Sequence, residues 1–167
     1  LAAEALGPVR ALLVASTDAP EQTPYAVGLI TLSEELFRHA KAVNGATILG
    51  DVAGRNRHIE HMLTIIEGQG GEHYTDFDRD GAIQDPGDGF GILPYTDGVA
   101  AQAAAAVSAA GSTDNVRIHA AEVQLVATNL RTWASDIVDL VLVIQTSTDP
   151  AAKQAAAGQA LEHRLAH

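Results

Sequence analysis

The 167-residue chain has no cysteine, few aromatic residues and few basic ones, and each shortage excludes a class of protein. Without cysteine there is no disulfide framework, thiolate zinc site, iron–sulfur ligation or covalent c-type haem attachment. Phe, Trp and Tyr make up 4% of the chain while alanine is abundant, which favours closely packed helices over a β-sandwich. The formal net charge of −11 argues against nucleic acid and anionic membrane surfaces as partners.

Long hydrophobic runs are also missing. The longest apolar stretches, such as Ile137 to Ile144, are interrupted by Asp139 and are too short to cross a bilayer, so the sequence predicts no transmembrane segment. The chain begins at Leu1 without a methionine, a basic region or an apolar signal sequence. We interpret it as a mature product whose signal peptide has been removed, which predicts an extracellular or periplasmic location.

Helical periodicity covers most of the chain, and strand patterns are essentially absent. Capping residues, prolines and glycines separate the periodic stretches. The expected helices span residues 7–16, 24–44, 47 or 51 to 67, 96–110, 113–145 and 150–165. The sequence therefore predicts a single all-α domain over residues 1–167, folded as an antiparallel helical bundle of four main helices.

Residues 68–95 interrupt the helical pattern and contain an acidic run, DFDRDGAIQDPGD, at residues 76–88. Its first three aspartates alternate and can turn toward one point, and Gly81 permits a sharp turn directly after them. Without a counter-ion these carboxylates would repel one another. The segment is therefore predicted to be an acidic metal-binding loop inserted between helices.

The run resembles the calcium loops of EF-hand, dockerin and thrombospondin type 3 proteins over thirteen residues. The resemblance implies calcium as a cofactor and Ile83 as an apolar residue that fixes the loop to the core. The implied ligands are Asp76, Asp78, Asp80, Ala82 through its carbonyl, Gln84, Asp85 and Asp88.

The run also departs from the EF-hand pattern. Gly87 stands where an EF-hand has its twelfth-position glutamate, Pro86 prevents a normal exit helix, and no second loop is present to pair with it. These departures favour a structural calcium clip over a calcium sensor. Weak binding suits the millimolar calcium outside a cell. The alternative is a solvated acidic loop without an ion.

Seven histidines are many for this length, and several can face inward. His58 and His61 lie three apart on one helix, His119 lies on the apolar seam of the 113–145 helix, and His39 borders another apolar stripe. A bundle that brings such residues together would bind a transition metal or a non-covalent haem. The candidate ligands of this second site are His58, His61, His119 and Glu122. The alternative is that these are hydrogen-bonded structural histidines.

No nucleophile motif stands out, and Glu60 and Glu67 fall on the polar side of their helix, where they are interpreted as solvated charges. The sequence therefore predicts a non-catalytic protein, with a metal-dependent oxidoreductase as the remaining enzymatic alternative. The first functional hypothesis is a calcium-stabilised, exported domain with a binding or cell-surface assembly role, through a protein partner or self-assembly. The second is a histidine-rich metal- or haem-binding bundle for storage, sensing or electron transfer.

Overall fold

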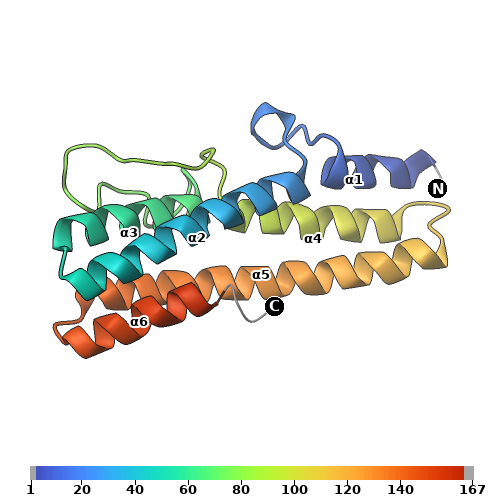
Figure 1. Cartoon of the computed structure of the whole chain (residues 1–167). Helices are drawn as coiled ribbons and strands as arrows, with labels where there is room; N and C mark the ends of the chain where they lie inside the picture. Colours follow the sequence, from blue (N-terminus) through green and yellow to red (C-terminus); the bar gives the residue numbers. More distant parts are fainter. Residues whose placement is uncertain (1–2, 164–167) are drawn as a thin grey trace.

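The computed structural model describes residues 3–163, and the regular secondary structure within that range is entirely helical. The elements are α1 (Ala3–Leu13), the 3-10 turn η1 (Pro20–Gln22), α2 (Tyr25–Leu49), α3 (Val52–Glu67), α4 (Ile92–Ser108), α5 (Asp114–Thr146) and α6 (Pro150–Glu162). The helices lie side by side along roughly one direction, and the segment between α3 and α4 forms a long irregular loop beside α3 (Figure 1). The predicted all-α class is confirmed.

Three helix starts are set by capping side chains. Asp51, Thr113 and Asp149 cap α3, α5 and α6, each accepting a hydrogen bond from a backbone N–H of the first turn. Such a cap satisfies a donor that the helix leaves unpaired and contributes about 1 kcal/mol. Local chemistry therefore fixes these boundaries.

Three helices differ from the expectation: α1 spans Ala3–Leu13 rather than residues 7–16, and the bounds of α2 and α4 differ because packing outweighs local propensity. Helix α2 runs through the predicted stop at residues 44–45 and ends at Leu49, where Gly50 adopts a left-handed conformation (φ 70°). Helix α4 starts at Ile92 rather than at residue 96, since Ile92 and Tyr95 are buried in the core. The loop consequently spans residues 68–91. Residues 164 and 165 of the predicted last helix lie outside the described range.

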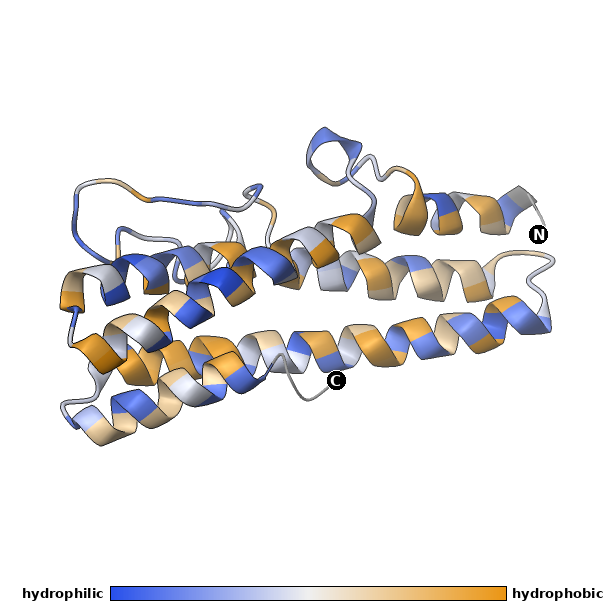
Figure 2. Ribbon diagram, in the orientation of Figure 1, coloured by the Kyte–Doolittle hydropathy of each residue, from blue (hydrophilic) through white to orange (hydrophobic). Residues whose placement is uncertain are grey.

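The core forms where α2 packs on α3, α4 and α6, and where α5 packs on α3, α4 and α6. The deepest residues come from one face of α3 and from the C-terminal half of α5: Ile59, Met62, Leu63, Ile66, Val141 and Ile144. Apolar and polar positions alternate around each helix (Figure 2). No described helix has the combination of length and hydropathy needed to span a bilayer.

Helices α2 and α4 approach closely through a reciprocal pair of contacts. Gly28 of α2 faces the ring of Tyr95, and Gly98 of α4 faces the ring of Tyr25; a Cβ at either glycine would lie 2.2 Å from a ring atom. The Tyr95 hydroxyl donates a 2.6 Å hydrogen bond to Asp88 at the end of the loop. Burial, and then this hydrogen bond, raise the pKa of Tyr95, so the phenol remains a donor. The helix contact thus also anchors the loop.

Candidate metal centre

Three histidines from two helices meet at the interface of α2 and α3. His39 comes from α2, while His58 and His61 come from one face of α3. The His39 Nδ1 atom lies 3.0 Å from the His58 Nδ1 atom and 3.3 Å from the His61 Nδ1 atom. One ring nitrogen from each residue therefore points at a common centre.

These separations match the donor spacing around a single metal ion. Nitrogen atoms about 2.0–2.1 Å from a tetrahedral ion lie about 3.3 Å from one another. A hydrogen bond joins one donor to one acceptor, so hydrogen bonding alone satisfies two of the three converging nitrogen atoms at a time. A cation accepts a lone pair from all three, and the donor set therefore fits a metal ion.

The outer ring nitrogens of two histidines have oxygen partners. His39 Nε2 lies 3.1 Å from Glu35 Oε1, and His61 Nε2 lies 3.4 Å from Gln84 Oε1. A carboxylate or amide oxygen accepts a hydrogen bond from a protonated ring nitrogen, so the proton lies on Nε2 and the lone pair on Nδ1. Metal-binding histidines use the same arrangement to fix ring orientation and tautomer. Glu35 and Gln84 thus orient the histidines toward the shared centre.

Electrostatics keep the cluster in its metal-binding form. Burial, reinforced by His61, His58 and Arg38, lowers the pKa of His39 from 6.5 to about 4. Burial also lowers the pKa of His58, again with His61 as the next cause. Because neutral imidazole is the form that binds a metal, the low pKa values leave these rings ready to bind at neutral pH.

The structure does not bring His119 and Glu122 to His58 and His61. Their side chains are 75% and 69% exposed on α5, where they pair with each other at 3.0 Å. The apolar seam on which His119 lies is buried only in the C-terminal half of α5. The third member of the cluster is instead His39, whose sequence signal was a carboxylate, Glu35, one helical turn before it.

The acidic loop is held by a buried carboxylate from α3. Glu60 is only 2% exposed. Its Oε2 atom accepts hydrogen bonds from the backbone of Phe77 (2.6 Å) and Asp78 (3.3 Å), and its Oε1 atom accepts one from Gln84 (2.7 Å). The interpretation of Glu60 as a solvated charge is therefore wrong, because the loop folds over this face of the helix.

A second carboxylate of α3 plays a similar part at the start of the loop. Glu67 accepts hydrogen bonds from the His73 backbone and from its ring Nδ1 atom, both at 2.7 Å. Its side chain is 10% exposed, so it too is not a solvated charge. One buried and one partly buried acid of the same helix thus fix the loop at two points.

The alternating aspartates shape the first turn of the loop. Asp76 accepts hydrogen bonds from the backbone of Asp80 and Gly81, and Asp78 accepts another from Asp80. Gly81 has φ 100°, as its predicted turn requires. Carboxylate oxygens of Asp76 and Asp78 also lie within 4.8 Å of an oxygen of Glu60. This trio is a second group of possible metal ligands.

The other acidic residues proposed as calcium ligands, Asp80, Asp85 and Asp88, are not part of that trio. The Asp80 side chain accepts from Ala82 N–H and Gln84 Nε2. Asp85 accepts from Gly87, and Asp88 accepts from Phe90 and Tyr95. Ile83 is 43% exposed, so it does not anchor the loop as the resemblance implied. Glu60 was missed because it is sixteen residues or more from any loop ligand in the sequence, and helix and loop meet only in the folded protein.

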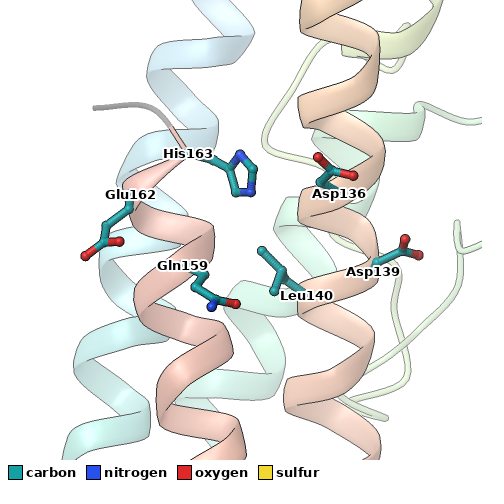
Figure 3. A pocket seen from close by; sticks show the side chains of 6 residues that line it. All are labelled: Asp136, Asp139, Leu140, Gln159, Glu162 and His163. Carbon is teal, nitrogen blue, oxygen red and sulfur yellow. The ribbon is translucent and has the colours of Figure 1, made fainter. Parts of the chain in front are cut away.

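A pocket elsewhere offers no such convergence of donors. It has a volume of about 580 Å³, lies between α5 and α6, and is lined by Asp136, Asp139, Leu140, Gln159, Glu162 and His163. His163 and Leu140 point into the gap, whereas the Glu162 carboxylate points away from it (Figure 3). An apolar cavity of about 210 Å³ shares His163 and continues toward α2. The metal centre is therefore best sought at the α2–α3 interface.

Comparisons of the chain with protein-family models, curated proteins and solved structures give no match. The class that fold and site together define is an all-helical protein with side-chain groups able to hold a metal ion.

Proposed function

We propose that this protein binds one transition-metal ion through the Nδ1 atoms of His39, His58 and His61. The observation that carries the proposal is their convergence at 3.0 and 3.3 Å, with the outer nitrogens of two rings bound to Glu35 and Gln84. Convergent lone pairs and fixed tautomers are the two requirements of a histidine metal site.

The donor set favours zinc or copper(II). Imidazole suits both ions, and no thiolate joins the cluster because the chain has no cysteine. Three protein ligands leave a coordination position for water or another small ligand, as in sites that exchange what they bind. A haem is disfavoured, because rings that converge within 3.3 Å leave no space for a porphyrin between them.

We infer that α2, α4, α5 and α6 act as an antiparallel four-helix frame for this site. Each helix of this set contacts the next around a closed ring. Helix α3 packs on α2 and, through its buried face, also on α4 and α5, and it supplies two of the three histidines. The frame therefore fixes α2, and α3 completes the site against it.

Metal titration tests the proposal. Chelator-treated protein should bind zinc with one-to-one stoichiometry in calorimetry. His39→Ala and His61→Ala should each weaken binding by at least about 100-fold, because even the partners that orient a metal-binding histidine contribute about 10–100-fold. His119→Ala is the matched control, because His119 is exposed and outside the cluster. Absence of micromolar binding, or equal affinity in His39→Ala and the parent, would overturn the assignment.

Calcium binding at the loop is a second candidate, supported by the proximity of Glu60, Asp76 and Asp78 oxygens. Hard oxygen donors suit calcium, and the loop resembles known calcium loops. Millimolar calcium should raise the melting temperature of chelator-treated protein, and Asp76→Asn should remove that rise. Asp114→Asn, on the exposed start of α5, is the control. An identical melting temperature with and without calcium would eliminate this candidate.

We further propose a non-catalytic role outside the cell, in which the protein stores, senses or transfers its ion or assembles at the cell surface. The acidic surface and the weak calcium site expected from the loop support export. Fractionation of the producing cell tests the location: recovery of the protein only with cytosolic markers would contradict it.

A further inference from the structure

Three buried alanines leave a space where four helices meet. Helices α2, α4, α5 and α6 contact one another around a closed ring. Ala40, Ala134 and Ala160 come from α2, α5 and α6, each is 4% exposed, and all three line an apolar cavity of about 210 Å³. Protein interiors contain few voids larger than a water molecule, so a space of this size is unusual in a core.

The walls of this cavity suit a small aromatic group. The larger side chains that line it are apolar or aromatic: Leu36, Phe37, Ile92, Leu130, Trp133 and Ile137. An engineered apolar cavity of about 150 Å³ in another protein stays free of water and binds benzene. The cavity described here is larger, so it accommodates one benzene ring that carries a short alkyl chain.

The cavity adjoins an acidic part of the surface. His163 lines both this cavity and the neighbouring pocket of about 580 Å³ between α5 and α6. Asp136, Asp139 and Glu162 also line that pocket, and no lysine or arginine lines either space within the described part of the chain. Asp136 lies nearer the gap than Asp139 does, and Glu162 points away from it (Figure 3). A positive charge on a ligand would therefore be attracted at this mouth, and a negative charge would be repelled.

We propose that this cavity binds a small aromatic amine, with the ring among the apolar side chains and the ammonium group at the mouth near Asp136. The ring fills the space that the three alanines leave, while the ammonium group stays partly hydrated and avoids the cost of full burial. No residue of the histidine cluster lines this cavity, so the proposal does not depend on metal binding.

Fluorescence titration of the full chain tests the proposal, because Trp133 is the only tryptophan in the sequence and lines the cavity. The probes are phenethylamine, phenylethanol and phenylpropionate at about pH 8, where histidine is neutral. Phenethylamine should change the Trp133 emission with a dissociation constant below about 1 mM. Phenylethanol should bind up to about fivefold more weakly, the contribution of a partly exposed ion pair, and phenylpropionate should bind most weakly.

Charge variants test the position of the ammonium group. Asp136→Asn should remove the preference for phenethylamine over phenylethanol and leave the affinity for phenylethanol unchanged. Asp114→Asn is the matched control, because Asp114 lies at the exposed start of α5 and lines neither space.

Two alanines of α6 provide a second measurement that needs no ligand. Ala156 and Ala160 are both 4% exposed, but only Ala160 lines the cavity. Ala160→Leu should keep the melting temperature of the parent or raise it, because the larger side chain fills existing space, and it should abolish phenethylamine binding. Ala156→Leu should lower the melting temperature by several degrees, because a packed core does not accommodate the added volume.

Four outcomes would overturn the proposal. A dissociation constant above about 1 mM for phenethylamine, or equal affinity for phenethylamine and phenylpropionate, would exclude an aromatic amine as the ligand. Undiminished binding by Ala160→Leu would place the probe elsewhere. Equal destabilisation by Ala156→Leu and Ala160→Leu would show that no space is present. Binding that appears only in Leu165→Asp would show that the end of the chain itself occupies the cavity.

Discussion

At the scale of single residues, Glu60 links the two candidate metal sites. It lies between His58 and His61 in the sequence, but its carboxylate accepts three backbone N–H groups of the loop. The Gln84 residue held in this way also contacts His61 through its side chain. A buried carboxylate is costly unless hydrogen bonds compensate for its lost hydration, and here the loop backbone supplies them.

Glu60→Gln should therefore destabilise the protein. The amide preserves shape, but its NH₂ group cannot accept a hydrogen bond from the backbone, so at least one buried donor loses its partner. We expect the free energy of unfolding to fall by about 1–3 kcal/mol in urea denaturation. Glu162→Gln, at an exposed position on α6, should change it little. Equal stability of the two variants would contradict the role of Glu60.

The histidine cluster illustrates which parts of the site were predictable. The spacing of His58 and His61 places both on one face of a helix, so the sequence could pair them. His39 lies on another helix, and only the packing of α2 on α3 brings it within 3.0 Å of His58. In the sequence, His119 lies on a more regular apolar seam than His39 does, but in the fold its side chain is exposed.

At the scale of secondary structure, local signals predicted helix starts better than helix ends. The capping oxygens of Asp51, Thr113 and Asp149 act within one turn, so sequence alone reveals them. The continuation of α2 through Gly45 depends on tertiary contacts of neighbouring residues such as buried Val43. A glycine inside a helix costs about 1 kcal/mol, which such burial can offset.

The two kinds of glycine in α2 should respond in opposite directions to alanine. Gly28→Ala should lower the melting temperature by several degrees, because the new methyl group would overlap the Tyr95 ring. Gly45→Ala meets nothing within 4 Å and should stabilise the helix by about 0.5–1 kcal/mol. Thermal unfolding of both variants measures this. A tolerated Gly28→Ala would mean that α2 and α4 are not in close contact there.

At the scale of the whole molecule, the chain is strongly acidic but organises its charge unevenly. The loop over residues 68–91 contains six acidic residues and one arginine, whereas α2 and α3 each contain two acidic and two basic residues. Composition predicted the overall charge, but the position of the acidic loop over α3 depends on where the chain folds back.

Stability of the metal-free protein should fall in mild acid. The pKa of His39 is about 4 when folded and 6.5 in the unfolded chain, so between these values the unfolded state binds more protons. Above about pH 6.5, His39 does not change the free energy of unfolding with pH. As the pH falls from there to about 4, its protonation in the unfolded chain lowers the free energy of unfolding by up to about 3 kcal/mol.

Urea denaturation at about pH 7 and pH 4.5 measures this loss. A His39→Gln variant should lose less stability over the same range, while His119→Ala should behave as the parent does, because His119 is exposed. If His39→Gln and the parent lose stability equally, carboxylate protonation alone accounts for the acid sensitivity.

The three histidines lie on two consecutive helices, and this placement affects how fast those helices can separate. An ion held jointly by His39 and His61 closes the stretch of chain that contains the α2–α3 turn. The two helices cannot then separate without breaking a coordination bond, so amide hydrogens along this hairpin should exchange with deuterium more slowly when the ion is present. Release of the metal and opening of the helical hairpin would then be the same event, so the metal's dissociation rate and the hairpin's opening rate should agree.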